Sequence, residues 1–276
     1  GLFTGPNGRA KLIHRIINAG RDVMTTKPFE TDADAAREVL LEARKLGRTV
    51  HLNSPAPVLP ADLRQIVDWQ QRFDLGRPIA CRADVWASYR EQPDGRWQDD
   101  PAQCPAAPVF RLGIYLINDL LRFFGKPLKA QVLSARIFTG RPTADNAQLG
   151  LLFDDGGIVN VFGSFCVKDH EHYKNQLVFN FENGTVYRNA GPIEDRPVHA
   201  PPAKLELVAD RGGEKIIERA EVTETSGGYQ WANFHRAIVG EPLPDEIDPE
   251  KIVEAVKVVE AMRRAEQSAG IAEVDS

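Results

Sequence analysis

The alternation of strand and helix is clearest in residues 21–52, which read RDVMTTKPFETDADAAREVLLEARKLGRTVHL. The stretch begins with a short apolar strand that ends at Lys27-Pro28, because proline lacks the backbone donor that a strand needs. A helix follows, which we expect Thr31 to open with Asp34 three residues later, and a second strand ends at Leu52. Strands separated by one helix and short connections are typical of a parallel α/β sheet.

The same rhythm extends toward the beginning of the chain. A turn-rich string at residues 4–8 precedes apolar residues at helical spacing, and Gly20 then ends the helix. An open doubly wound sheet needs more strands than these, and its Gly-rich phosphate turn lies between the first strand and the first helix. No Gly-x-Gly-x-x-Gly sequence occurs in the chain. The sequence therefore predicts a parallel sheet that begins in the middle of its pattern.

A proline-rich segment separates this sheet from the rest of the chain. We therefore expect two domains, at residues 1–54 and 55–276. Residues 109–124 carry apolar side chains at helical spacing and predict an amphipathic helix. From about residue 128 to 221, short β-rich runs alternate with turn sequences such as Asn183-Gly184, which predicts an open, mostly antiparallel sheet. The expected fold class is α/β plus α+β.

The composition disfavours several classes of protein. The chain has 34 Lys and Arg residues against 39 Asp and Glu, a net charge of -5 and no long basic run, so we expect no nucleic-acid partner. Its three cysteines form no Cys-x-x-Cys pair, which disfavours disulfides and structural zinc and favours a reducing, cytoplasmic location. No apolar run approaches the roughly 20 residues of a membrane helix, so we expect no membrane partner.

Lys27 is the first candidate for chemistry, because it stands at the predicted carboxyl end of a parallel strand. Ligands of open α/β sheets bind at such ends, and a lysine ammonium offers three hydrogen-bond donors there. It could hold a cofactor amide or a substrate hydroxyl. The alternative, from position alone, is a solvated lysine without such a role.

The polar face of the 109–124 helix is the second candidate. Its members at helical spacing are Arg111, Tyr115, Asn118 or Asp119, and Arg122. Tyr115 could move a proton if positive neighbours such as Lys27 and Arg111 lowered its pKa by roughly 2 to 3 units from about 10. In that arrangement Lys27 would lie across a cleft from Tyr115. Alternatively, Tyr115 packs beneath a loop.

Residues 169–173, Asp-His-Glu-His-Tyr, carry a weaker signal. His170 and His172 would share one face of a strand, and two histidines with a carboxylate can hold a transition metal. The spacing implies no third ligand, so we expect no metal. Asp99-Asp100, in a proline-rich loop, could meet a sugar hydroxyl, but capping a turn is the favoured interpretation.

The sequence resembles the Gfo/Idh/MocA oxidoreductases along almost its whole length. These proteins share a Thr-Pro-Asn run, a helix, Ala-Gly-Lys-x-Val and Glu-Lys-Pro. The matching segments are Thr4-Gly5-Pro6-Asn7, Ala19 to Pro28, Gly113 to Arg122 with Gly125, Asp145-Asn146 before Leu151 to Gly156, Asn233 to Gly240 and Ile252 to Gly270. Their order along the chain is the family's order, which makes the resemblance specific.

The resemblance implies an N-terminal Rossmann domain that binds NAD or NADP and a C-terminal domain built on an open, mostly antiparallel sheet. The parallel sheet would then be a truncated, Rossmann-like one. Pro6, Asn7, Lys27 and Pro28 would contact the cofactor. The family's lysine of Glu-Lys-Pro lies beside the nicotinamide and the substrate, so Lys27 inherits that role.

Tyr115 stands where the family often has histidine. Members that resemble glucose-fructose oxidoreductase have tyrosine there, followed by asparagine, as Tyr115 and Asn118 are here. The resemblance thus gives Tyr115 the acid/base role. We expect Arg111, Asn118 and Asp119, on the same helix face, to bind the substrate.

Three departures from the family pattern matter. Thr26 replaces the usual glutamate before Lys27, and Arg111 occupies a position where the tyrosine branch tends to have aspartate. The family's first strand, Gly-rich turn and ribose-binding carboxylate are missing before Gly1. We therefore expect either a fragment of a longer protein or a chain that has lost its cofactor site.

The leading hypothesis is an NAD(P)-dependent oxidoreductase that transfers a hydride between nicotinamide and a carbinol carbon of a sugar or polyol derivative. One alternative is an NAD-using glycosidase of the same fold with no net redox change. Another is a non-catalytic, sugar-responsive regulatory protein. The open sheet face should leave apolar surface, which a homodimer or homotetramer would cover.

Overall fold

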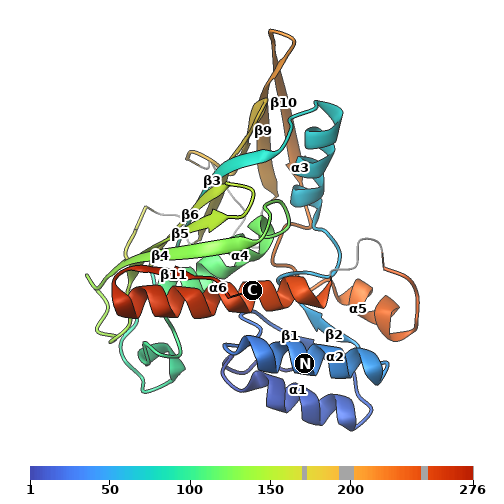
Figure 1. The fold of residues 1–276 in the computed structure, drawn as a ribbon, viewed down its shortest axis with the longest axis vertical. Helices are drawn as coiled ribbons and strands as arrows, with labels where there is room; N and C mark the ends of the chain where they lie inside the picture. The colour runs from blue at the N-terminus through green and yellow to red at the C-terminus, as the bar shows by residue number, and fades with distance from the viewer. Residues whose placement is uncertain (170–172, 193–201, 244–247, 276) are drawn as a thin grey trace.

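The computed structural model of this protein describes residues 1–169, 173–192, 202–243 and 248–275. Within these residues it contains a two-stranded parallel sheet and a nine-stranded, mostly antiparallel sheet (Figure 1). The α-helices are α1 (Arg9–Asn18), α2 (Ala33–Lys45), α3 (Ala61–Arg72), α4 (Ile114–Leu120), α5 (Trp231–Ile238) and α6 (Pro249–Ser268). The strands are β1 (Val23–Thr25), β2 (Val50–Leu52), β3 (Pro78–Trp86), β4 (Pro127–Ala135), β5 (Asn146–Phe153), β6 (Ile158–Ser164), β7 (Lys174–Phe181), β8 (Gly184–Arg188), β9 (Ala203–Arg211), β10 (Glu214–Val222) and β11 (Ile271–Glu273). The predicted fold class is confirmed.

The small sheet pairs β1 with β2 in parallel, and Leu2 adds a bridge to Thr25. Helices α1 and α2 bury their apolar faces with it in one hydrophobic cluster. The expected start of α2 is wrong in detail. The residue that caps the helix is Asp32, whose carboxylate accepts from the N–H of Ala35. Thr31 precedes the cap, and its backbone N–H donates to the carboxylate of Glu30 over 2.8 Å.

The large sheet has the order β10-β9-β8-β7-β3-β6-β5-β4-β11. Every neighbouring pair in it is antiparallel except β3 with β6, which run in parallel. Its strands alternate buried and exposed residues, as a sheet with one covered face requires. In Figure 1 the β9–β10 hairpin runs beside α3, and its tip extends beyond that helix. Within the described ranges, no helix combines the length and apolar character that crossing a membrane requires.

The expectation of one regular α-helix over residues 109–124 is wrong at both ends. Val109–Gly113 form a π-helical turn, and α4 then ends at Leu120. The start of the turn packs closely on Gly163 of β6. A methyl group at this glycine would come within 2.8 Å of the backbone nitrogen of Val109. Beyond α4, Phe124 stacks on the ring of Phe153, with centroids 5.0 Å apart, which draws the chain back to the sheet.

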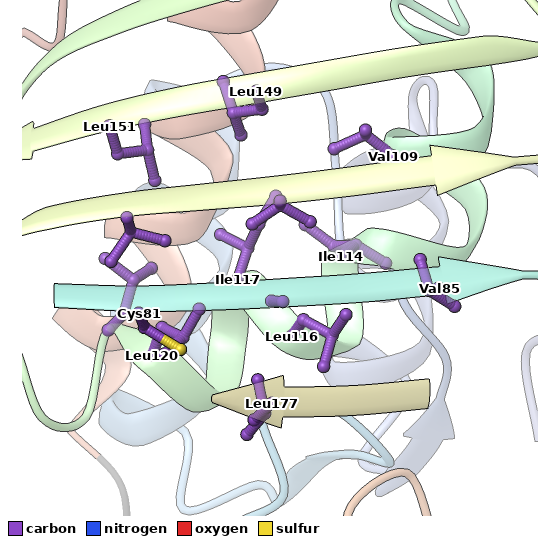
Figure 2. Close-up of a cluster of buried hydrophobic side chains, with 14 of the residues drawn as sticks. Cys81, Val85, Val109, Ile114, Leu116, Ile117, Leu120, Leu149, Leu151 and Leu177 are labelled. Atoms are coloured by element: carbon purple, nitrogen blue, oxygen red, sulfur yellow. The ribbon is translucent and has the colours of Figure 1, made fainter. Parts of the chain in front are cut away.

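Apolar side chains of α4 face the covered side of the sheet. Figure 2 shows Leu116, Ile117 and Leu120 directed toward β3 and its neighbours, among side chains such as Cys81 and Leu177. Each fully buried Leu or Ile contributes about 1.5–3 kcal/mol relative to an exposed one. This packing fixes the rotation of α4 about its axis, and therefore the direction of its polar residues.

Helix α6 belongs to both hydrophobic cores. Ile252, Val253 and Val256 pack with the cluster of the small sheet, whereas Val258 and Met262 pack with the cluster of the large one. The helix crosses below the large sheet and reaches α2 (Figure 1). One rigid helix therefore holds the two sheets together.

Candidate active site

The carboxyl ends of β1 and β2 lie at the same edge of the small sheet, and their turns are joined by Asn53. The Asn53 side chain is 1% exposed. Its Oδ1 accepts hydrogen bonds from the backbone N–H of Lys27 over 3.1 Å and from the hydroxyl of Thr26 over 3.3 Å. The position of Lys27 is thereby set from the neighbouring strand as well as from its own.

Lys27 and Tyr115 meet at this edge. The Nζ of Lys27 lies 4.3 Å from the centroid of the Tyr115 ring, over its face, and donates a hydrogen bond to the carbonyl oxygen of Arg111. A cation over an aromatic face is favourable by about 0.5–2 kcal/mol, depending on desolvation. The structure thus brings together the two residues on which the predicted chemistry depends, although their roles stay predictions.

The acidities at the site differ from the expectation. Burial lowers the pKa of Lys27 to about 8, and the positive charges of Arg111 and Arg9 add to the effect. Burial raises the pKa of Tyr115, and the hydrogen bond from Asn53 opposes that rise only in part. The expected lowering of the phenol pKa is wrong, because burial outweighs the hydrogen bond from Asn53. Tyr115 is therefore a protonated phenol near neutral pH.

Arg111, predicted to bind substrate, is paired with another side chain. Its guanidinium donates to both carboxylate oxygens of Glu91, over 2.5 and 2.8 Å, and lies 4.7 Å from the Phe165 ring centroid. Arg141 also binds this carboxylate, over 3.1 Å. What Arg111 presents to Lys27 is its backbone carbonyl.

Asn118 and Asp119 point to two different environments. The Nδ2 of Asn118 donates to the hydroxyl of Ser54 over 2.9 Å, next to Asn53, while its buried Oδ1 has no partner among the described residues. Asp119 is in a buried ion pair with Arg188, 3.3 Å away. Asn118 thus remains near the candidate site, whereas Asp119 belongs to a separate buried cluster.

That buried cluster centres on Arg188, which is 2% exposed. Its Nη1 lies 2.8 Å from Asp62 and 3.3 Å from Asp119, so two carboxylates share one guanidinium. The same carboxylates hold Ser226: Asp62 accepts from its N–H over 3.1 Å and Asp119 from its hydroxyl over 2.6 Å. Burial raises the pKa of Asp119, and Arg188 opposes the rise.

Residues 225–229, between β10 and α5, form a strap over Tyr115. The carbonyl of Gly227 accepts from Asn53 Nδ2 over 3.2 Å, and a methyl group on Gly227 would lie 3.2 Å from the Tyr115 ring. The hydroxyl of Tyr229 donates to that of Thr26 over 3.3 Å. The sequence interpretation missed the strap and Asn53. Asn53 could have been selected in the same way as Lys27, because it follows the carboxyl end of the second parallel strand, where ligands of such sheets bind.

The other residues predicted to contact a cofactor have protein partners. The carbonyls of Pro6 and Pro28 accept from the backbone N–H and the guanidinium of Arg9, respectively, and Asn7 donates to Gln103 over 3.3 Å. The first N–H groups of α1 are occupied as well. Glu30 accepts from Gly8 over 3.1 Å and from Ala10 over 2.8 Å, where an anion would otherwise bind.

The part of the chain that the structure describes holds no group of three His, Cys, Asp or Glu side chains placed to bind an ion. His170 and His172 lie outside the described residues. Asp99 accepts from the N–H groups of Asp94 and Gly95, and Asp100 accepts from that of Ala102, so both cap turns, as favoured above.

Comparison with known proteins places these features in context. Residues 63–187 match the GFO/IDH/MocA C-terminal domain. An uncharacterized oxidoreductase of Schizosaccharomyces pombe is 25% identical over 136 residues, covering 44% of this chain and 33% of that protein. The chain therefore spans only about a third of the curated relative that it matches.

Solved structures share the whole fold at low sequence identity. A putative NADPH-dependent oxidoreductase of Desulfitobacterium hafniense gives a TM-score of 0.78 at 14% identity, over 98% of this chain and 78% of that one. Aldose-aldose oxidoreductase of Caulobacter crescentus, complexed with glycerol, gives 0.72 at 18% identity, over 98% and 78%. An Agrobacterium radiobacter oxidoreductase in complex with NAD+, L-tartaric acid and magnesium gives 0.69 at 12% identity, over 97% and 77%. Residues 63–187 are therefore similar to a GFO/IDH/MocA C-terminal domain, the chain shares its fold with these solved structures, and the family resemblance of its sequence is confirmed.

Proposed function

We propose that this chain carries the proton-transfer site of an NAD(P)-dependent oxidoreductase acting on a carbinol or carbonyl carbon of a sugar or polyol derivative. The observation that carries the proposal is the meeting of Lys27 and Tyr115, with Nζ 4.3 Å from the ring centroid, at the carboxyl edge of a parallel sheet. An ammonium and a phenol are the groups that polarise and protonate an oxygen as a carbonyl becomes an alcohol.

The nicotinamide end of a dinucleotide would be held by residues at this edge. Lys27 offers an ammonium donor, and the buried Oδ1 of Asn118 is an acceptor that lacks a partner among the described residues. The N-terminus of α1, in contrast, is neutralised by Glu30, so the diphosphate would need other residues. When bound, the nicotinamide supplies or takes the hydride.

The chain's own residues would handle the oxygen of the substrate. Lys27, with a pKa near 8, would place a positive charge beside the carbonyl oxygen, and Tyr115 would donate its proton as the alcohol forms. In oxidation the same phenol oxygen would have to accept a proton. Because burial raises the pKa of Tyr115, the phenol would be protonated near neutral pH, which is the state that reduction of a carbonyl requires.

The choice of a sugar or polyol draws on the comparisons. One structural neighbour is an aldose-aldose oxidoreductase with glycerol and another binds L-tartaric acid, both polyhydroxylated ligands. The test is to follow NADH and NADPH oxidation by the full reading frame that contains this chain, with a panel of aldoses and ketoses. Tyr115→Phe should abolish turnover and leave cofactor binding intact, whereas Tyr187→Phe, on the open sheet face, should leave the rate unchanged.

Other outcomes would support the alternatives. Turnover of a glycoside without net NADH formation would replace the dehydrogenase proposal with the NAD-using glycosidase. A protein that turns over no substrate, and whose sugar binding Tyr115→Phe leaves intact, would favour the non-catalytic regulatory alternative. Equal rates in Tyr115→Phe and the parent would remove Tyr115 from the chemistry.

We further propose that the open face of the large sheet joins two or more copies of the protein. Leu133, Ile158 and Tyr187 are 67%, 53% and 36% exposed on the strand positions that alternate with the core. Apolar residues gathered on a sheet face favour association. Leu133→Asp should lower the sedimentation mass of the assembly, whereas Leu41→Asp on α2 should not.

A further inference from the structure

The hydrogen bonds of Asn53 at the site can each be assigned a direction. A backbone N–H can only donate, so the atom of Asn53 that contacts Lys27 N must be the carbonyl Oδ1. The amide nitrogen Nδ2 then faces the hydroxyl of Tyr115 and the carbonyl of Gly227, each 3.2 Å away. All four hydrogen-bonding positions of this buried amide are occupied.

The same logic extends through the neighbouring hydroxyls. Oδ1 can only accept, so Thr26 uses its hydrogen on Asn53 and must accept from Tyr229. Likewise Nδ2 can only donate, so the oxygen of Tyr115 accepts from Asn53. The result is a polarised set of hydrogen bonds leading from Tyr229 through Thr26 and Asn53 to Tyr115. Successive bonds of this kind strengthen one another.

We propose that Asn53 is a positioning residue that makes Tyr115 a proton donor. Its amide occupies the acceptor side of the phenol, which leaves the phenolic hydrogen for the substrate oxygen. This inference rests on the proposed function. In carbonyl reduction, for which a bound nicotinamide would supply the hydride, the O–H bond of Tyr115 would break and its proton would join the carbonyl oxygen. The electron pair stays on the phenolate, where Asn53 Nδ2 still donates to it.

Other groups around the phenol do not duplicate this role. Lys27 lies over the ring face and donates to the Arg111 carbonyl. Tyr89, Tyr173 and Tyr229 are the titratable neighbours whose ionisation would oppose that of Tyr115. The described hydrogen bond to the Tyr115 hydroxyl comes from Asn53.

The test measures the acidity of residue 115 without cofactor or substrate. Tyr115 is replaced by a fluorinated tyrosine whose phenol ionises near neutral pH, and its ionisation is followed by ¹⁹F NMR. A hydrogen bond to a charged group is worth enough to shift a pKa by roughly 1–2 units. Asn53→Leu should therefore raise the pKa of the fluorinated phenol by about that amount, because the phenolate loses its donor.

Two further variants complete the experiment. Asn53→Asp keeps acceptors for Lys27 N and Thr26 but offers no donor, so it should also raise the pKa, and it carries the test if Asn53→Leu does not fold. Asn180→Leu is the matched control, since its amide donates to the hydroxyl of Thr185 rather than to that of Tyr115. It should leave the pKa unchanged. An unchanged pKa in a folded Asn53→Leu or Asn53→Asp protein would overturn the proposal.

Kinetics then separate this proposal from the proposed function. In carbonyl reduction, Asn53→Leu should lower kcat about tenfold or more for a loss of about one pKa unit of stabilisation, with KM little changed. A pKa shift in a protein that reduces no carbonyl compound would leave Asn53 in its role and refute the oxidoreductase. Reduction at the parent rate by Asn53→Leu would refute the role of Asn53 alone.

Discussion

Two polar clusters lie one helical turn apart on α4, at Tyr115 and at Asp119, and they differ in how their charges and hydrogen-bond donors are paired. At Tyr115, one partly buried lysine meets neutral groups, and the phenol keeps a hydrogen that no described bond uses. At Asp119, two buried carboxylates share the single guanidinium of Arg188. In the proposed catalytic cluster, the phenolic hydrogen of Tyr115 and the ammonium of Lys27 have no carboxylate partner among the described residues. In the structural cluster, by comparison, both carboxylates bind the guanidinium of Arg188.

The largest effect should come from breaking the structural cluster. Arg188→Ala leaves two buried carboxylates without their cation, and removal of one partner from such a pair costs about 3–5 kcal/mol. Urea unfolding measured by circular dichroism should show this loss. Arg77→Ala, which breaks the surface pair with Glu182, should cost about 0.5 kcal/mol or less. A loss below about 1 kcal/mol for Arg188→Ala would contradict a structural role for the cluster.

The strap between the two clusters provides the second prediction. Gly227 has a φ of 97°, which side-chain-bearing residues rarely adopt, and a methyl group would press on the Tyr115 ring at 3.2 Å. Gly227→Ala should therefore destabilise the protein by about 1–2 kcal/mol and lower activity at Tyr115. Gly228→Ala is the matched control, because the nearest atom to its methyl would be 3.6 Å away, an ordinary contact. Equal losses in the two variants would show that the contact with Tyr115 has no part in the effect.

The third prediction concerns the charge of Lys27. Lys27 has a folded-state pKa of about 8 against 10.5 unfolded, so between these values the unfolded chain binds more protons. Stability contributed by this group must therefore rise with pH across the window, by at most about 1.4 kcal/mol per pH unit. In Lys27→Met this contribution disappears. Denaturant unfolding from pH 7.5 to 10 should give a steeper rise for the parent than for the variant, and parallel curves would argue against a lowered lysine pKa.

Much of the fold could be predicted from local patterns. The strand ending at Lys27-Pro28, the helix after it and the turn-separated strands of the large sheet all follow from periodicity and turn residues, which act within a few positions of the chain. The π-helical turn before α4 could not be predicted in this way. It depends on the approach of that turn to Gly163 on β6, a contact between segments some fifty positions apart.

The site was predicted in part for the same reason. Lys27 and Tyr115 could be selected from strand position and helix spacing. Helix spacing alone could not show that Asp119 faces Arg188 while Tyr115 faces Lys27, because both residues share the polar side of one helix. Nor could it show that Arg111 pairs with Glu91.

The sequence by itself determined the alternation of elements, the family resemblance and the two residues on which the proposed chemistry depends, because each is encoded in short-range patterns of side chains. Only the tertiary structure decided that the phenolic hydrogen of Tyr115 takes part in no hydrogen bond among the described residues. That outcome depends on Asn53 and the strap, brought to Tyr115 from 62 and 112 positions away in the chain by packing of the two cores on α6. Hydrogen-bond direction and desolvation are properties of that assembled environment, and no local pattern encodes them.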